Sequence, residues 1–235
     1  MKLYYDFHIH SALSPCSDDD MTPNNIVNMA ILKGLDAIAV TDHNSCKNLL
    51  PIIELGKENG LIVVPGMELQ TKEEVHVLCL FRNIEDAFKF QEIVYSKLPS
   101  INNSPELFGN QLIYNEFDEV KATEDIMLLN STNLNFDEAY ELVKEFKGAF
   151  IPCHIDKETY GVISNLGFIP MYLDIKTVEV ANMNKFENYL KTGIIKNEYK
   201  VLKNSDAHNL GQISERENFI EVENLSINSI IDVLS

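Results

Sequence analysis

The first segment of the chain alternates between apolar and polar residues. In 3–10 the odd positions hold Leu, Tyr, Phe and Ile, whereas the even positions include an Asp and two His. This period of two predicts a β-strand with one apolar face. The unbroken apolar run 37–40 predicts a parallel strand buried on both faces. Between them, Thr22 and Pro23 provide a hydroxyl cap and a first-turn proline for a helix that closes near Gly34.

The rest of the chain continues with helical and strand patterns. A second helical pattern runs to about Gly60, another covers 84–98, and Asn135 with Glu138 forms a capping pair for a helix to Lys147. Further strands are predicted at 61–64, 75–81, 149–153, 177–180, 200–203 and 219–222, and Ser226 caps a final helix. The Asn-rich stretch 99–135 has no clear periodicity, and we interpret it as an insertion or lid.

Strands that alternate with helices predict an α/β fold with a mostly parallel sheet and enough βα units to close a barrel. We expect residues 1–235 to form a single domain, because barrels of this size routinely form one unit. In such folds the working residues follow the carboxyl ends of the strands.

Charge and composition narrow the expected partners. Asp and Glu number 36 against 19 for Lys and Arg, which leaves a formal net charge of −17. So acidic a chain offers no electrostatic footprint for a phosphate backbone, and we expect no extended nucleic acid as partner. No apolar run approaches the ~20 residues that span a bilayer, and the start of the chain lacks the apolar stretch of a signal peptide. We therefore expect a cytoplasmic protein without membrane contact, with its four scattered cysteines reduced.

Histidines and acidic residues gather on predicted strands and at their ends. His8 and His10 lie about 7 Å apart along one strand face, so both imidazoles can reach a single metal ion. Asp206 and His208 repeat this spacing after a later strand. The other candidate ligands are His43, Glu68, His76 and His154, each on a predicted strand or soon after one.

Each of these residues alone has an ordinary structural explanation. A strand histidine is often a hydrogen-bonded core residue, Asp42 can simply orient His43, and Glu68 can be a solvated or capping acid. Together they are informative, because all of them lie on predicted strands or after them. A random distribution would place several of them on helices and elsewhere on the surface. Nitrogen and carboxylate donors without paired thiolates indicate a catalytic cluster of divalent Zn, Mn or Fe rather than a structural zinc site.

The order of these motifs resembles the PHP (polymerase and histidinol phosphatase) family. The matching motifs are Asp6-x-His8-x-His10-Ser11, Thr41-Asp42-His43-Asn44, Gly66-Met67-Glu68, His76, His154 and Ser205-Asp206-Ala207-His208. The resemblance covers residues 3–208 and implies a distorted (β/α)7 TIM-like barrel with a trinuclear metal centre. It implies one ion bound by His8, His10, Asp206 and Glu68, a second bound by Glu68, His76 and His154, and a third bound by His43 and His208.

The third ion lacks one clear ligand, because the loop 14–20 departs from the family pattern. Counted from His10, Cys16 falls where many relatives have histidine; counted back from Thr22, Asp18 falls at the aspartate. We take Asp18 as the candidate ligand, with Asp20 or Cys16 as alternatives, although a solvated acidic loop also explains the segment. A carboxylate here suits Mn or Fe, whereas a thiolate favours Zn.

Two or three such ions can lower the pKa of a bridging water and hold both oxygens of an in-line displacement at phosphorus. We therefore expect a metal-dependent phosphoesterase whose partner is a small phosphorylated metabolite. Asp42 is a candidate to orient a metal-bound histidine or relay a proton. Arg216 is a candidate phosphate clamp, although an ion pair with Glu215 or Glu217 explains it equally well.

Two other functions are also compatible with the residues. A phosphodiesterase or short-oligonucleotide exonuclease is disfavoured by the acidic balance but allowed by bound cations. A metal-stabilised scaffold without catalysis is the other, and the near-complete ligand set argues against it. The substrate, the metal identity and the oligomeric state stay open, since specificity would lie in the loops after the strands.

Overall fold

The computed structural model of the chain describes residues 1–196 and 198–235. The strands are β1 (Lys2–Ile9), β2 (Ala37–Val40), β3 (Ile62–Val63), β4 (Gly66–Gln70), β5 (His76–Leu80), β6 (Leu112–Tyr114), β7 (Val120–Thr123), β8 (Ala149–Pro152), β9 (Thr177–Glu179), β10 (Lys200–Leu202) and β11 (Phe219–Glu221). The helices are α1 (Pro23–Leu32), α2 (Leu49–Glu58), α3 (Ile84–Lys97), α4 (Pro105–Phe108), α5 (Phe136–Glu145), α6 (Val162–Leu166), α7 (Met183–Thr192) and α8 (Ile227–Leu234), with a short 3-10 helix at Leu210–Gln212. None of the described helices is long and apolar enough to cross a membrane.

Helix caps that the sequence predicts are present in the structure. Thr22 accepts a hydrogen bond from the backbone of Asn25 and stands before Pro23 at the start of α1. Asn135 and Glu138 form a reciprocal capping box on α5. These local signals work because they depend only on neighbours along the chain.

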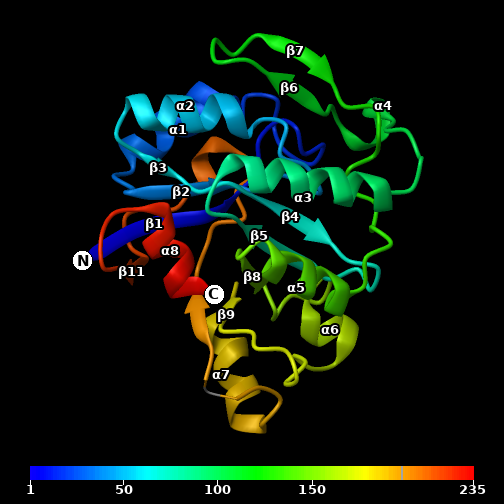
Figure 1. Cartoon of the computed structure of the whole chain (residues 1–235), viewed down its shortest axis with the longest axis vertical. Helices are drawn as coiled ribbons and strands as arrows, with labels where there is room; N and C mark the ends of the chain where they lie inside the picture. Colours follow the sequence, from blue (N-terminus) through cyan, green and yellow to red (C-terminus); the bar gives the residue numbers. More distant parts are fainter. Residues whose placement is uncertain (197) are drawn as a thin grey trace.

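The described strands fall into four small sheets (Figure 1). One has the order β11-β1-β2-β3, in which β1, β2 and β3 are parallel and β11 is antiparallel at the edge. The second, β4-β5-β8, is antiparallel throughout. The parallel pair β9-β10 and the antiparallel hairpin β6-β7 complete the set.

A mixed α/β fold is present, but the expected closed (β/α)7 barrel is not found in the described part of the chain. The main departure lies at β4 and β5, which the short connection 71–75 joins as an antiparallel pair. A parallel pair would need a crossover of a dozen or more residues, which this connection lacks. Glu68 comes after β3, as expected, but it lies in the middle of β4, a strand that the sequence analysis did not predict.

Two isolated bridges join these sheets where the candidate ligands lie. Ile9 at the end of β1 pairs with Ala207, and His43 pairs with Glu68. Residues nearly two hundred positions apart therefore lie side by side. The ends of β1 and β2 are thereby brought against β4 and the segment after β10.

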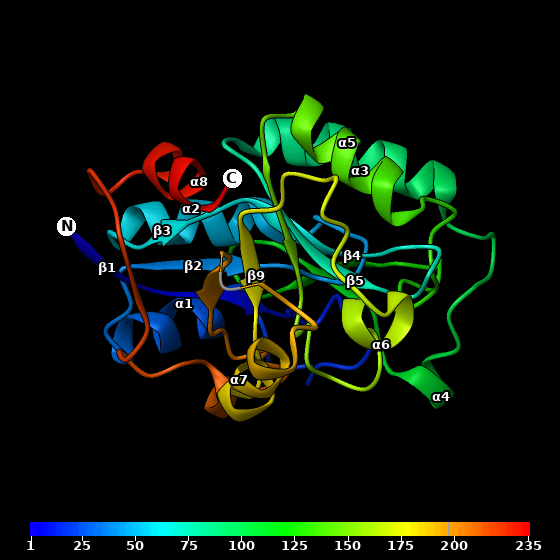
Figure 2. The same cartoon turned by 90° about the horizontal axis from the view of Figure 1, so that it is seen from below.

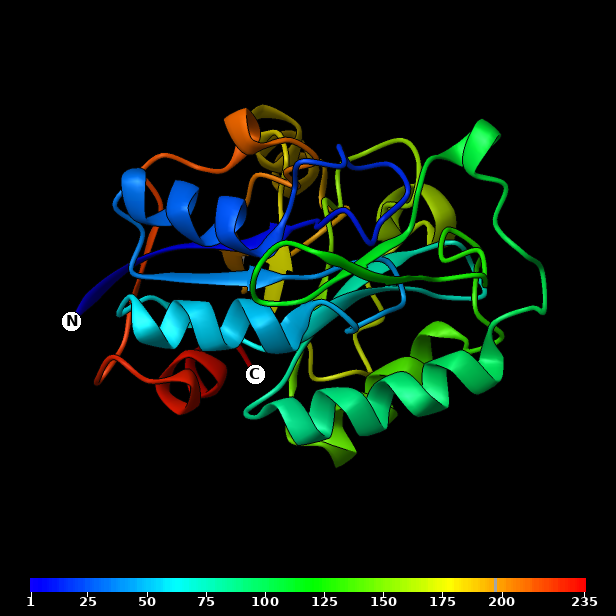
Figure 3. The same ribbon diagram turned by 90° about the horizontal axis from the view of Figure 1, so that it is seen from above.

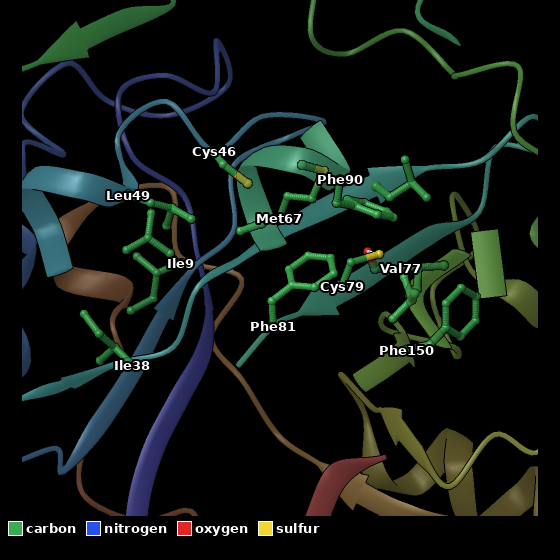
Figure 4. Close-up of a cluster of buried hydrophobic side chains, with 14 of the residues drawn as sticks. Ile9, Ile38, Cys46, Leu49, Met67, Val77, Cys79, Phe81, Phe90 and Phe150 are labelled. Carbon is green, nitrogen blue, oxygen red and sulfur yellow. Dashed lines mark hydrogen bonds between the residues drawn. The ribbon is translucent and has the colours of Figure 1, made fainter. Parts of the chain in front are cut away.

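Helices cover the sheets and bury the apolar faces of the strands. Helices α1 and α2 pack against each other along the parallel sheet, and α2 and α3 lie on the same side of the molecule (Figure 2, Figure 3). In Figure 4, Met67 and Phe81 pack near Phe90 of α3, with the thiols of Cys46 and Cys79 in the same core. All four cysteines are free, as the sequence predicts.

Candidate metal centre

The structure brings the predicted donors together from distant parts of the chain. They are His8 on β1 and His10 just after it, His43 after β2, Glu68 on β4, His76 on β5, His154 after β8, and Asp206 and His208 after β10. Their rings crowd together: the centroid of His10 lies 5.1 Å from that of His8, 4.5 Å from His43 and 4.4 Å from His208. The convergence follows from the sheet topology rather than from any local motif.

Glu68 lies at the middle of this cluster and is almost fully buried. Its Oε1 lies 2.8 Å from Nδ1 of His76 and 3.2 Å from Nε2 of His8. Its Oε2 lies 2.9 Å from Nδ1 of His43. Burial raises the pKa of this carboxyl group, but the three imidazoles together lower the pKa of Glu68 well below its usual value. The carboxylate is therefore ionised and has both oxygens turned toward imidazole nitrogens.

A second carboxylate approaches the same imidazoles. Oδ1 of Asp206 lies 3.3 Å from Nε2 of His8 and 3.2 Å from Nε2 of His10. Its other oxygen, Oδ2, accepts a hydrogen bond of 2.5 Å from Nζ of Lys157. His8 and His10 thus present their Nε2 atoms, 3.2 Å apart, between two acidic groups.

The donor atoms are close to one another yet poorly satisfied. Both carboxylate oxygens of Glu68, and Nδ1 of His43 and of His154, make no hydrogen bond of acceptable geometry within the described part of the chain. A buried polar atom without a partner costs about 1–3 kcal/mol. Shared cations would satisfy these atoms, and imidazole with carboxylate is a donor set that Zn, Mn and Fe accept. The residues therefore fit divalent metal ions.

Five groups of close donors occur among the described residues, and three of them consist of predicted ligands alone. The first is His8, His10 and Glu68, the second His43, Glu68 and His76, and the third His10, His43 and His208; within each, the ligand atoms lie within 4.8 Å of one another. Glu68 belongs to the first two groups, so its carboxylate can serve more than one ion. The third group contains imidazoles alone.

Glu179, which sequence analysis did not identify, holds His8 in place. Its Oε2 lies 2.9 Å from Nδ1 of His8, and its Oε1 accepts the backbone N–H of His154 at 3.1 Å. A carboxylate on the far nitrogen of a metal-binding histidine orients the ring and raises its basicity. The signal available in the sequence was a single acidic residue, Glu179, within the predicted apolar strand 177–180.

Asp42 lies behind the cluster rather than within it. It accepts hydrogen bonds from the backbone and hydroxyl of Ser11, at 2.8 and 2.6 Å, and from the hydroxyl of Ser14, at 2.7 Å. Ser14 Oγ in turn lies 3.0 Å from Nδ1 of His10. Asp42 therefore reaches a candidate ligand only through Ser14.

The side chains of Asp18, Asp20 and Arg216 do not line the cavity that opens onto the cluster. Asp18 and Asp20 are exposed on the loop, and Asp18 reaches the cluster only through its backbone N–H, which donates to the carbonyl of His208 at 2.9 Å. Arg216 pairs with Asp36 at 3.1 Å and lies over the ring of Tyr4. Tyr4 is near the start of β1 and His10 just past its end, about 20 Å away at 3.3 Å per residue. Arg216 is thus at the opposite end of the strand.

Cys16 is the loop residue that does reach the cluster. It lines the cavity together with His208 and His43. Burial raises the pKa of this thiol, but its interactions with those two imidazoles lower the pKa of Cys16 to about 7.

A cavity of about 280 Å³ opens onto the cluster. It is lined by Cys16, His43, Glu68, Gln70, His76, Leu129, His154, Lys157, Thr159, Tyr160, Asp206 and His208. Lys157 provides the cation of this lining, and the ring of Tyr160 stacks on that of His76, with centroids 4.3 Å apart. The cavity thus combines metal-binding donors with an ammonium group and an exposed aromatic ring.

A family model described as "PHP domain" matches residues 6–169, which is more than half of the chain. Over 80 residues the chain is 32% identical to phosphoribosyl 1,2-cyclic phosphate 1,2-diphosphodiesterase of Eggerthella lenta, covering 32% of this chain and 29% of that protein. Over 81 residues it is 31% identical to the 5′-3′ exoribonuclease Rnm of Escherichia coli, covering 32% of this chain and 27% of that protein. The chain thus matches less than a third of the length of either relative.

Among solved structures, the chain is similar to a lesion-specific endonuclease from Pyrococcus furiosus. The TM-score is 0.69 at 19% sequence identity, and the alignment covers 100% of this chain and 56% of that one. The endonuclease is also known in complex with a 27-mer duplex substrate. At this identity the likeness establishes the shared fold.

These comparisons correct the expectation of a small phosphorylated partner and no nucleic acid. One relative in sequence is an exoribonuclease, and a chain of the same fold binds duplex substrate. A net charge sums the whole chain and does not describe the field at one site. Lys157 lines the cavity, and divalent cations would add further positive charge there.

Proposed function

Since the chain belongs to the PHP domain family, we propose that it is a metal-dependent phosphodiesterase that cleaves phosphodiester bonds of nucleic acid in the cavity lined by the histidine cluster. The observation that carries the proposal is the convergence of six imidazoles and two carboxylates in one cluster, of which four imidazoles and both carboxylates line the cavity. The relatives named as a diphosphodiesterase and an exoribonuclease support the choice of a phosphodiester.

Two or three divalent ions of Zn, Mn or Fe form part of this proposal. His8, His10, Asp206 and Glu68 would hold one ion, Glu68, His76 and His154 a second, and His43 and His208 a third. When bound, such ions supply Lewis-acid stabilisation of the charge that develops on the reacting phosphate. The unsatisfied oxygens of Glu68 and the overlapping donor groups support more than one ion.

Lys157 is our candidate for binding the substrate phosphate, in place of Arg216. Its ammonium group lies beside Asp206 and lines the cavity, and its side chain is 41% exposed. An ammonium group at this place attracts a phosphate oxygen and orients the ester beside the cluster. Lys157 also partly neutralises Asp206, which would otherwise repel the substrate.

Tyr160 is our candidate for contacting a nucleobase. One face of its ring stacks on His76, and the residue is 41% exposed at the cavity. Bases of single-stranded nucleic acid stack on exposed aromatic rings with about 1–3 kcal/mol per base. This contact favours a nucleotide over a simple phosphate ester.

The proposal is tested by hydrolysis assays on the chain loaded with Mn²⁺ or Zn²⁺. The substrates are p-nitrophenyl phosphate, bis(p-nitrophenyl) phosphate and 5′-phosphorylated single-stranded RNA and DNA oligomers. We expect cleavage of the diester and the oligomers, removed by a chelator and by His8→Ala or Asp206→Ala. Arg216→Gln is the matched control, and it should retain activity because Arg216 pairs with Asp36 far from the cavity.

Two outcomes would contradict the proposal. Cleavage of the monoester with no cleavage of any diester would leave a phosphatase of small molecules. Full metal occupancy without hydrolysis of any substrate would leave a metal-stabilised scaffold.

A further inference from the structure

The loop 14–20 places a thiol, and not a carboxylate, next to the imidazoles at the mouth of the cavity. Cys16 lines the cavity together with His43 and His208. Asp18 does not line it: its side chain is exposed, and only its backbone N–H reaches the cluster, by donating to the carbonyl of His208 at 2.9 Å. Cys16 itself is exposed, while the other three cysteines are buried. The thiol is therefore reachable from solvent and adjacent to candidate ligands.

A second observation points to an ion at this place. His10, His43 and His208 bring three ligand atoms within 4.8 Å of one another without any acid among them. Nδ1 of the buried His43 faces Oε2 of Glu68, 2.9 Å away, so Nε2 is the nitrogen of this ring that is left for an ion beside Cys16. Three imidazoles so close together, with a thiol beside two of them, form a donor set that has no other evident function.

The segment 99–135 holds this loop in position. Gly109, at φ +99, packs so closely on the backbone of Pro15 that a Cβ atom could not fit between them. Asn110 donates to Oδ2 of Asp19 at 2.9 Å, and the hydroxyl of Tyr114 donates to the carbonyl of Asp19 at 3.1 Å. These contacts lie on both sides of Cys16 and fix the loop against the cluster.

The other side of the loop is anchored to the cluster itself. Ser14 Oγ contacts Nδ1 of His10 and accepts the backbone N–H of His43 at 3.2 Å. Cys16 therefore has little freedom to turn away from the two imidazoles. A preorganised donor of this kind gains affinity for an ion because its ordering has already occurred.

We propose that Cys16 is a thiolate ligand of a metal ion bound together with His43 and His208, which makes this outer site selective for ions that accept sulfur, such as Zn²⁺, Fe²⁺ or Co²⁺. Thiolate with imidazole suits these ions, whereas Mn²⁺ and Mg²⁺ prefer oxygen donors. The inference rests on the metal centre of the proposed function but not on its catalysis.

The test is the absorption spectrum of the chain titrated with Co²⁺. A cobalt–thiolate bond produces a charge-transfer band in the near ultraviolet that cobalt bound to nitrogen and oxygen lacks. We expect this band in the wild type, and we expect Cys16→Ser to lose both the band and one bound ion per chain. Asp18→Asn, in the same exposed loop, is the matched control and should retain both.

Cys153 requires a control of its own, because its thiol also lies within 4.8 Å of donor atoms of Glu68 and His154. Cys153 is buried and does not line the cavity, whereas Cys16 does. Cys153→Ala should therefore retain the band. A cobalt-saturated wild type without the band, or a band that survives Cys16→Ser, would overturn the proposal.

The spectrum separates this inference from the proposed function. A band that depends on Cys16 in a chain that cleaves no phosphodiester would support the thiolate ligand and refute the phosphodiesterase. Hydrolysis with no such band would do the reverse. Alkylation of Cys16 by iodoacetamide, followed by mass spectrometry, provides a second measurement, and saturating Zn²⁺ should slow it at least tenfold.

Discussion

Glu68 is a buried carboxylate whose ionised form depends on the positive or partly positive groups around it. Removing a charge from water costs several kcal/mol, and that cost is offset only by close partners. The imidazoles of His76 and His43 lie within 2.9 Å of its oxygens. Glu179 is a second buried carboxylate with a close imidazole partner, because its Oε2 contacts Nδ1 of His8. Each ligand residue thus depends on a neighbour that orients it.

Glu179→Gln tests this dependence on orientation. The amide keeps the size of the side chain but removes the negative charge that faces Nδ1 of His8. The affinity for the metal should therefore fall about 10–100-fold. Competition with a zinc chelator measures the change. Glu221→Gln, an exposed acid on β11, is the control and should leave the affinity unchanged. Equal affinity in both variants would contradict the orienting role of Glu179.

The segment 99–135 is an example of an element that is held by specific polar contacts rather than by its own core. Glu124, just after β7, is buried, forms an ion pair with Lys47 and accepts the hydroxyl of Tyr95 at 2.9 Å. At the tip of the hairpin, Asp118 accepts the hydroxyl of Thr22 at 2.6 Å, at the cap of α1. The segment is therefore fastened to three other elements.

Glu124→Gln should loosen this attachment. Burial raises the pKa of Glu124, but the hydrogen bond from Lys47 and further donors lower it below the usual 4.5. A lowered carboxyl pKa contributes stability that is complete above that usual value and is lost as the pH falls through the folded pKa. We expect the variant to lose about 1.5–3 kcal/mol of unfolding free energy near neutral pH, since it breaks a charged hydrogen bond.

Urea unfolding of the metal-free wild type and variant, near neutral pH and again at about pH 3.5, measures that difference. The gap between the two proteins should shrink in acid, because the wild-type carboxylate also becomes protonated. A gap that stays constant with pH would show that Glu124 acts through its shape alone.

At the scale of the whole molecule, a net charge of −17 makes bound cations matter for stability as well as for chemistry. The donors of the metal centre come from β1, β4 and β5 and from the ends of β2, β8 and β10. An ion bound to them joins three separate sheets. The apo chain must instead hold crowded imidazoles and unsatisfied carboxylate oxygens in one place.

Metal removal should therefore lower the melting temperature. An ion at 100 times its Kd stabilises the folded state by about 2.7 kcal/mol, which corresponds to roughly 5–10 °C for a chain of this size. Differential scanning calorimetry with EDTA and then with added Zn²⁺ measures the shift. His8→Ala removes a ligand of one proposed ion and should therefore show a smaller shift than the wild type. If neither EDTA nor Zn²⁺ changed the melting temperature of the wild type, no ion would bind tightly enough to stabilise the fold.

The sequence predicted features that depend on neighbouring residues better than features that depend on distant segments. The strand near 3–10 and the caps at Thr22 and Asn135 were foreseen, because periodicity and capping are local properties. The meeting of His8, His10 and Asp206 was expected from the resemblance to the PHP family, not from a local signal. The position of Glu68 within β4 and the antiparallel pairing with β5 were not foreseen. They depend on the five-residue connection 71–75, whose length favours an antiparallel hairpin. The sequence analysis assumed alternating strands and helices and therefore did not predict this hairpin.

The amino-acid sequence by itself determined which residues can bind metal, where most helices and strands form and that the thiols stay free. The tertiary structure decided which of those residues meet: Cys16 instead of Asp18 beside His43, Lys157 at the cavity instead of Arg216, and Glu179 behind His8. The reason is physical. Residue type and periodicity act over a few neighbours, whereas distances between remote segments follow from sheet order and from how loops are held.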